Sequence, residues 1–144
     1  MNQPSAIVIG AGIVGLATAR ALAIRGYHVT VIERNETQTG ASVRNFGMIW
    51  PVGQPGGTLF ERAMLSRSIW KTICDEAGIW HSETGSLHLA YQQDELNVLQ
   101  EYADEGKAYR KCQILSPAQV LQRSDSVRSV ALKGALWSET EMIV

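Results

Sequence analysis

Residues 6–33 read AIVIGAGIVGLATARALAIRGYHVTVIE, and this stretch decides the fold. Its first four residues form an apolar, mostly β-branched run, which predicts a strand buried on both faces. A helical pattern follows from Ile13 to Arg25, with Gly26 placed where a left-handed C-terminal cap belongs. Residues 27–33 predict a second strand. The stretch is therefore a strand–helix–strand unit, and such crossovers pair their strands in parallel.

The turn between the first strand and the helix has the pattern Gly-x-Gly-x-x-Gly. Gly10 permits the tight turn, Gly12 lets a pyrophosphate approach the backbone, and Gly15 lets the helix pack closely on the strand. Unpaired N–H groups at the start of the helix, around Ile13 and Val14, offer a partial positive charge to phosphates. The alternative interpretation is a glycine-rich turn that binds no ligand.

Glu33 ends the second predicted strand, close to the spacing at which dinucleotide-binding units carry an acidic residue. A carboxylate in this place accepts hydrogen bonds from ribose hydroxyls and repels a 2′-phosphate, which disfavours NADP. Taken alone, Glu33 is equally a solvated carboxylate at a strand end. The glycine pattern and Glu33 together predict a dinucleotide site, but they do not separate FAD from NAD.

Composition narrows the function classes. The 144 residues are 45% hydrophobic and 19% charged, as in a globular protein, and the formal net charge is −1. No basic stripe is present, so we expect no nucleic-acid partner. Cys74 and Cys112 have no metal or redox spacing, which predicts buried thiols in a reducing, cytoplasmic compartment and no metal site. The apolar residues 6–24 contain Arg20 and follow no basic residue, so we expect neither an export signal nor a membrane span.

The rest of the chain predicts further elements and one long loop. Residues 34–57 lose all periodicity, which is typical of a functional loop. Capping boxes at residues 58–61 and 116–119 predict that a helix begins at each, the first ending at Gly78. Another helix is expected over residues 94–105, with Gly106 as its terminator and with the inward residues Leu96, Leu99, Tyr102 and Ala103. Strands are expected over residues 85–90 and 112–115 and, weakly, over 127–144.

The three histidines carry no predicted chemistry. His28 lies among apolar neighbours in the second strand, which favours a packing role. His88 falls on the polar side of the strand over residues 85–90, and we expect it to face solvent. His81 is expected in a loop.

Residues 40–51, which read GASVRNFGMIWP, narrow the choice of cofactor. With the GAGIVG loop and Glu33, this Ala-Ser-x-x-Asn-x-Gly stretch resembles the FAD-dependent oxidoreductases of the D-amino-acid oxidase, glycine oxidase and sarcosine oxidase superfamily. The resemblance covers essentially the whole chain, including residues 85–89 and 134–137. It implies an α/β fold: a Rossmann-like FAD-binding domain of the glutathione-reductase type over residues 1–80. Residues 81–144 would begin an antiparallel α+β substrate domain.

The resemblance also implies how the cofactor is held. FAD would bind in extended form, with Glu33 on the adenosine ribose and Arg34 beside the adenine. Non-covalent binding is expected, because no histidine lies near the loop where some relatives attach flavin. The other implied contacts are Ala41, Ser42, Arg44 and Asn45 along the pyrophosphate and flavin edge, and Gly47 and Met48 at the isoalloxazine ring. Arg44 is alternatively an exposed loop charge, Asn45 a turn residue, and Trp50 is expected in core packing.

The implied activity is oxidation of a C–N bond of a small amine or amino acid by hydride transfer to flavin, with aminophosphonates among the candidate substrates. The alternatives are an NAD-binding dehydrogenase domain and a non-catalytic nucleotide-binding subunit. Members of this superfamily are usually over twice as long, so we interpret the sequence as the N-terminal part of an enzyme, inactive alone. Self-association through unpaired strands is expected. Substrate and catalytic residues are not predicted.

Overall fold

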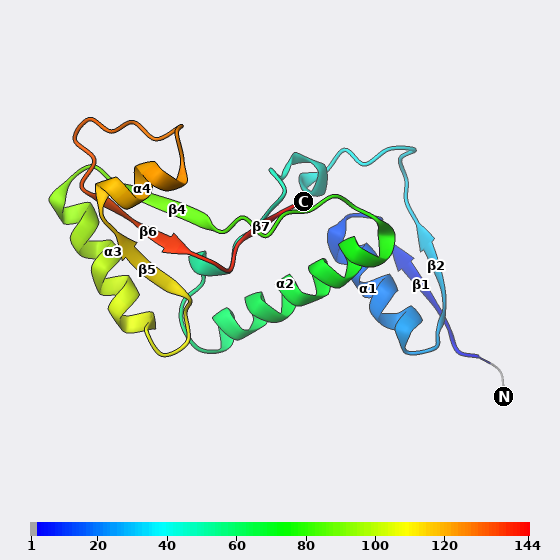
Figure 1. The fold of residues 1–144 in the computed structure, drawn as a ribbon. Helices are drawn as coiled ribbons and strands as arrows, with labels where there is room; N and C mark the ends of the chain where they lie inside the picture. Colours follow the sequence, from blue (N-terminus) through cyan, green and yellow to red (C-terminus); the bar gives the residue numbers. More distant parts are fainter. Residues whose placement is uncertain (1–2) are drawn as a thin grey trace. The chain divides into compact units, whose positions relative to one another are not determined.

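The computed structural model describes residues 3–144, which form two compact units, one ending at Phe46 and the other spanning Gly47–Val144. The first unit is the predicted strand–helix–strand. Its elements are β1 (Ser5–Ile9), α1 (Ile13–Ile24) and β2 (His28–Ile32), and the two strands pair in parallel from Ser5 opposite His28 to Ile9 opposite Ile32 (Figure 1). Gly26 follows α1 with a φ of 85°, as the left-handed cap requires.

Only one face of the β1–β2 pair is covered among the described residues. Val8 and Ala19 are buried where β1 packs against α1. Ile7 and Ile9 alternate to the other side of β1 and are 68% and 86% exposed. The prediction that this strand is buried on both faces is therefore wrong for the described part of the chain, because no described element covers that second face. His28, expected in packing, is exposed.

The loop after β2 is more ordered than its missing periodicity suggested. It contains a single turn of 3-10 helix, η1 (Ala41–Arg44), within the first unit. The second unit opens with a short strand, β3 (Met48–Ile49), and a further 3-10 turn, η2 (Pro51–Gly53). Short hydrogen-bonded turns of this kind have no periodic sequence pattern, so hydrophobic periodicity does not detect them.

The long helix α2 spans Thr58–Ala77 and ends, as predicted, at Gly78, which has a φ of 64°. Its start differs from the prediction. Gly57, not Thr58, is the N-cap, and the helix has no side-chain capping bond. The predicted capping box at residues 58–61 is thus wrong by one position: Thr58 already lies in the helix, where its side chain does not cap the first turn.

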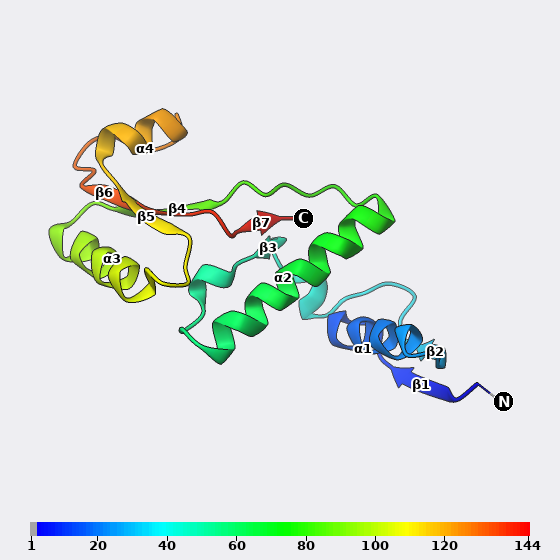
Figure 2. The ribbon, with the colours of Figure 1, turned by 60° about the horizontal axis from the view of Figure 1, so that its bottom comes forward.

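A three-stranded antiparallel sheet organises the remainder of the second unit. Its order is β4 (Ser86–Ala90), β6 (Gly134–Ser138) and β5 (Cys112–Leu115). The helices α3 (Gln93–Gly106) and α4 (Pro117–Arg123) lie on opposite faces of this sheet (Figure 2). On the α4 side the core consists of Leu115, Val120, Leu132 and Ala135. The antiparallel sheet that the resemblance implies is confirmed.

The end of the chain is paired rather than loose. Strand β7 (Met142–Ile143) runs antiparallel to β3, and the Val144 N–H donates to the Gly47 carbonyl oxygen at 2.9 Å. Of the weakly patterned residues 127–144, only β6 and β7 are strands. The expected division into residues 1–80 and 81–144 concerns the domains of a longer enzyme, and it stays a prediction beside the division at Phe46 and Gly47.

The ends of α3 and α4 test how well local sequence patterns predict helix boundaries. Ser116 caps α4 by accepting from the Gln119 N–H at 3.4 Å, with Pro117 at the first helical position, as predicted. Gly106 is the last residue of α3, so the helix ends where predicted, although Lys107 rather than a left-handed glycine is the C-cap. Gly106 is also buried, and an added Cβ would lie 2.6 Å from the Arg110 side chain, so this glycine allows close packing.

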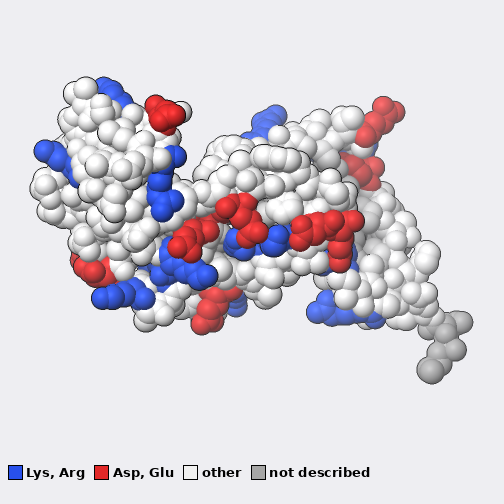
Figure 3. Space-filling view, in the orientation of Figure 1, with Lys and Arg blue, Asp and Glu red and all other residues white. Residues whose placement is uncertain are grey.

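Charges are well mixed on the face drawn in Figure 3, where acidic and basic side chains adjoin. Arg67 and Lys71 of α2 both pair with Glu83, for example. In the described part of the chain, no helix combines the length and apolar character that crossing a membrane requires. Among residues 3–144, no group of three or more His, Cys, Asp or Glu side chains is arranged to hold a metal ion.

Candidate cofactor site

The glycine turn between β1 and α1 is closed by backbone packing. Gly10 has a φ of 96°, a conformation that favours glycine, and its N–H donates to the Ile32 carbonyl oxygen at 2.7 Å. A Cβ at Gly15 would overlap the carbonyl oxygen of Gly10. The first turn of α1 therefore lies directly against the loop, as the role predicted for Gly15 requires.

The N-terminus of α1 presents backbone donors beside this turn. Gly12 is the N-cap and makes no side-chain capping bond, and the first intrahelical bond runs from the Leu16 N–H to the Gly12 carbonyl oxygen at 2.9 Å. The Ile13 N–H donates to the Ser42 hydroxyl oxygen at 2.9 Å. The N–H groups of Val14 and Gly15 have no acceptor within the helix. This end of α1 can bind an anion.

Ser42 completes the same corner from η1. Because its hydroxyl oxygen accepts from the Ile13 N–H, its own proton is left to donate to another acceptor. The pairing joins residues that are 29 positions apart in the sequence. It also sets the size of the opening, since an added Cβ on Gly12 would come within 3.3 Å of the Ser42 hydroxyl oxygen.

Glu33 follows β2 and faces the glycine turn, as predicted. Its Oε2 accepts from the Ala11 N–H at 2.8 Å, and its Oε1 accepts from the Asn35 N–H at 3.1 Å. These two backbone donors, Ala11 first, hold the pKa of Glu33 below its usual value. A charged carboxylate in this place is an acceptor that suits donors such as hydroxyl groups.

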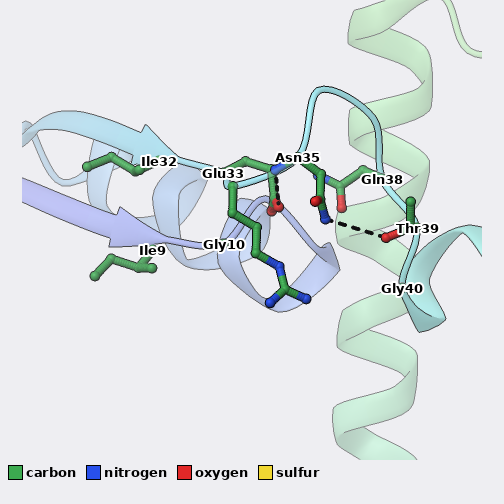
Figure 4. A pocket seen from close by; sticks show the side chains of 9 residues that line it. Ile9, Gly10, Ile32, Glu33, Asn35, Gln38, Thr39 and Gly40 are labelled. Carbon is green, nitrogen blue, oxygen red and sulfur yellow. Dashed lines mark hydrogen bonds between the residues drawn. The ribbon is translucent and has the colours of Figure 1, made fainter.

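A pocket of about 400 Å³ opens beside Glu33. Figure 4 shows the Glu33 carboxylate and the Asn35 side chain near one another at its edge, with Asn35 reaching Thr39 across the loop at 3.5 Å. The strand ends contribute Ile9 and Ile32. The full lining is Ile9, Gly10, Ile32, Glu33, Arg34, Asn35, Gln38, Thr39 and Gly40.

The structure brings together some predicted site residues and not others. Gly10, Gly12, Ile13, Val14, Gly15, Glu33, Arg34 and Ser42 surround the turn and its pocket. Ala41, Arg44 and Asn45 lie in or just after η1 and are exposed. Gly47 and Met48 belong to the second unit, where Met48 pairs with Ile143, so their predicted place at the flavin ring is not tested.

Sequence reasoning missed several residues of this site. Ala11, which donates to Glu33, stands at a variable position of the glycine pattern, and its backbone rather than its side chain takes part. Asn35, Gln38, Thr39 and Gly40 line the pocket from the loop that follows β2. The available signal was their place directly after a strand-end carboxylate, since ligands of open α/β sheets bind outside the carboxyl ends of strands.

His88 departs from the prediction that it faces solvent. Its ring stacks on Trp50 with centroids 5.7 Å apart, and its Nε2 lies 2.9 Å from the Ser86 hydroxyl oxygen. The side of β4 that carries His88 is the side covered by α3, where Leu99 and Tyr102 line a pocket with His88. The alternation of polar and apolar residues in the sequence does not show that a helix covers this side. The expectation for the thiols holds for Cys74, which is fully buried, while Cys112 is only half-buried.

Comparison with known proteins identifies the family. Residues 5–144 match the family described as DAO, FAD dependent oxidoreductase. The chain belongs to this family. Its α/β fold and the family expected from residues 10–51 are thereby confirmed, and the cofactor of the family is FAD, not NAD.

Solved structures of DAO-like enzymes superpose on nearly the entire chain. A glycine oxidase from Bacillus cereus matches 99% of the chain with a TM-score of 0.80 and 25% identity. The L-proline dehydrogenase from P. horikoshii matches 100% with a TM-score of 0.82 and 28% identity. The chain spans 40% and 39% of these two proteins.

A curated bacterial protein is also similar in sequence to part of the chain. The tRNA 5-methylaminomethyl-2-thiouridine biosynthesis bifunctional protein MnmC of Chromobacterium violaceum is 35% identical over 109 residues. That match takes in 72% of this chain and 16% of the relative. The matched stretch is therefore a smaller share of this relative than of the two solved structures.

Proposed function

We propose that the chain forms the FAD-binding part of a DAO-family enzyme that oxidises a C–N bond of a small amine or amino acid. The observation that carries this proposal is the pair of bonds from Ala11 and Asn35 to Glu33, which hold a carboxylate beside the glycine turn and its pocket. A negative charge at that place suits the ribose of an adenine dinucleotide.

The fit to FAD is argued from the two ends of the site. At the helix, Gly12 leaves the backbone open, and the Val14 and Gly15 amides have no acceptor in α1, so a pyrophosphate would replace missing partners. The Ser42 hydroxyl would donate to the same phosphates, since Ile13 occupies its oxygen. At the strand ends, Glu33 would accept from the ribose hydroxyls and Arg34 would lie beside the adenine.

The remaining contacts rest on the resemblance. Ala41, Arg44 and Asn45 would follow the pyrophosphate and the flavin edge, and Gly47 and Met48 would approach the isoalloxazine ring. Binding would be non-covalent, because no histidine is near residues 41–48 in the sequence. A cytoplasmic location and self-association through open strand edges are part of the same proposal.

The substrate class follows from the family and the charge of the chain. FAD, when bound, supplies the hydride acceptor for the carbon beside the amine nitrogen. The similar solved proteins named above are a glycine oxidase and an L-proline dehydrogenase, which favours a C–N bond of an amino acid or related amine. A small molecule is preferred to a nucleic acid because the net charge is −1. Aminophosphonates remain candidates.

The test begins with the colour of the purified enzyme that contains this chain, because the chain alone is expected to be inactive. We expect a flavin absorption band, release of FAD rather than FMN on heating, and loss of the band when a substrate amine is added without oxygen. The panel contains glycine, proline, a primary alkylamine and a 2-aminoalkylphosphonate. A colourless protein that binds NAD, or one that binds neither nucleotide, would overturn the proposal. A yellow protein bleached by none of the amines would overturn its substrate class.

A further inference from the structure

Glu141 is a buried carboxylate outside the dinucleotide site. It is 3% exposed and lies just before β7. Its Oε1 accepts from the Val52 N–H at 3.0 Å and from the Thr140 hydroxyl at 2.8 Å, and its Oε2 accepts from the Ser86 hydroxyl at 3.2 Å. Three donors thus compensate its burial, and one of them leads to a second polar group.

Ser86 links Glu141 to His88 through two hydrogen bonds whose donors and acceptors can be assigned. A carboxylate only accepts hydrogen bonds, so the Ser86 hydroxyl donates its single proton to Glu141. The Ser86 oxygen must then accept from the His88 Nε2, which lies 2.9 Å away. In neutral histidine only one ring nitrogen carries a proton. The network therefore places that proton on Nε2 and leaves Nδ1 as an acceptor.

The surroundings of His88 keep its ring neutral and in place. Burial lowers the pKa of His88, while the charge of Glu141 opposes this shift more weakly. The ring stacks on Trp50 with an interplanar angle of 19°. His88 of β4, two residues of α3 and residues of the 50–53 segment help to line a small pocket on the α3 side of the sheet.

This pocket has a volume of about 150 Å³, and its wall is mainly apolar. His88 supplies an imidazole to that wall. Tyr102 contributes its ring, but its hydroxyl already donates to the Val52 carbonyl oxygen. The complete lining is Trp50, Val52, Gly53, His88, Leu99, Tyr102 and Leu136. No lysine or arginine is in it.

We propose that Glu141, Ser86 and His88 form a relay that presents the Nδ1 of neutral His88 as the hydrogen-bond acceptor of a binding site for a small amine. The apolar wall would contact the carbon chain of the ligand, and an N–H of its ammonium group would donate to Nδ1. Glu141 adds a negative charge behind the relay that favours a cation. Arg110 stacks on the Tyr102 ring at 4.1 Å without lining the pocket.

The inference deepens the proposed function, because both concern binding of an amine. Only the identity of the natural ligand rests on the proposed function; the relay itself does not. In the relay, His88 touches the ligand, whereas Ser86 and Glu141 are positioning residues. Their effect is on which nitrogen carries the proton, and this can be measured without any turnover.

The first test reads the tautomer. In the purified protein labelled with nitrogen-15 at histidine, long-range proton–nitrogen NMR spectra distinguish protonated from unprotonated ring nitrogens, and His88→Gln identifies the His88 signals. We expect protonated Nε2 and unprotonated Nδ1 at neutral pH. Ser86→Ala should give a mixture of the two tautomers, while Ser68→Ala on the exposed side of α2 should change nothing. Protonated Nδ1 in the unmodified protein would overturn the relay.

The second test adds a ligand. Ethylammonium should shift the Nδ1 signal in a saturable way, whereas tetramethylammonium, a cation without an N–H, should not. Ser86→Ala should weaken ethylammonium binding at least about twofold, as the competent tautomer becomes less populated. Glu139→Gln, an exposed neighbour of Glu141, is the charge control and should leave the affinity unchanged. Equal responses to both cations, or none, would overturn the amine site.

These outcomes are separable from the proposed function. A saturable, N–H-dependent shift in a protein that retains no FAD would support the amine site and contradict the flavin proposal. A protein that retains FAD but shows no shift at Nδ1 would support the flavin proposal and contradict the amine site. The proposed FAD contacts lie within residues 10–48, which the relay does not include.

Discussion

Gly12 and Gly15 belong to one turn, yet they should respond to substitution in different ways. A Cβ at Gly15 would overlap backbone, the carbonyl of Gly10, which cannot move without opening the turn. We expect Gly15→Ala to lower the free energy of unfolding by about 1–3 kcal/mol. Urea denaturation followed by circular dichroism measures this. A fully stable Gly15→Ala protein would contradict the close approach of α1 to the loop.

Gly12 is expected to matter for the ligand rather than for the fold. Its φ of −67° suits any residue, and the nearest atom that an added Cβ would meet is the Ser42 hydroxyl oxygen, at 3.3 Å. Gly12→Val should therefore change stability by less than about 1 kcal/mol but abolish flavin retention, because the side chain fills the place of the pyrophosphate. Flavin content after purification is the readout. A fully yellow Gly12→Val protein would contradict this role.

The bond between Ala11 and Glu33 should be visible in a pH titration. The folded state lowers the pKa of Glu33 below 4.5, since backbone N–H groups favour the charged form. The stability from this interaction is therefore complete above the unfolded pKa and is lost as pH falls through the lower, folded value. The Ala11 amide proton shift should follow that titration. Glu33→Gln is the control, and an unchanged titration at Ala11 in this variant would contradict the pairing.

At the scale of elements, two helix starts offer a matched comparison. Ser116 caps α4 through its side chain, whereas Thr58 lies inside α2 and caps nothing. We expect Ser116→Ala to cost about 0.5–2 kcal/mol of unfolding free energy and Thr58→Ala less than about 0.5 kcal/mol. Urea denaturation of both variants checks this. Equal losses would mean that Thr58 caps α2 after all.

Elements encoded by local chemistry were predictable from the sequence. The β1–α1–β2 unit, the end of α2 at Gly78 and the start of α4 at Ser116 depend on residues a few positions apart. The capping box of α3 was missed because Gln92, a rare capping residue, forms it with Glu95. The end of α3 at Gly106 was also predictable, although its C-cap, Lys107, is not in the left-handed conformation that a capping glycine adopts.

The residues of the candidate sites likewise fall into those predictable from the sequence and those that only the fold brings together. Gly10, Gly12, Gly15 and Glu33 were predictable because one crossover carries them all, and the structure does place Glu33 at the turn. Ser86 and Glu141 are 55 residues apart, and their bond depends on the pairing of β4, β6 and β7. No period or spacing in the sequence encodes such a meeting, so His88 was expected in solvent.

At the scale of the whole molecule, uncovered apolar strand surface should drive association. Ile7 and Ile9 are exposed on a two-stranded sheet whose outer edges have no partner among the described residues. We expect the isolated chain to self-associate with rising concentration, and Ile9→Lys to reduce this by placing a charge on the exposed face. Sedimentation velocity is the measurement. A chain that stays monomeric at all concentrations would contradict the expectation.

The central claim is that Glu33 and the glycine turn hold the adenosine and pyrophosphate of FAD, and titration of the apoprotein with FAD and FMN tests it most directly. If Glu33 accepts from the ribose, Glu33→Ala removes charge-assisted bonds of about 1.5–3 kcal/mol, which is about one to two decades in FAD affinity. FMN has no adenosine ribose, so its affinity should not change. Unchanged FAD affinity in Glu33→Ala, or an equal loss for FMN, would contradict the account.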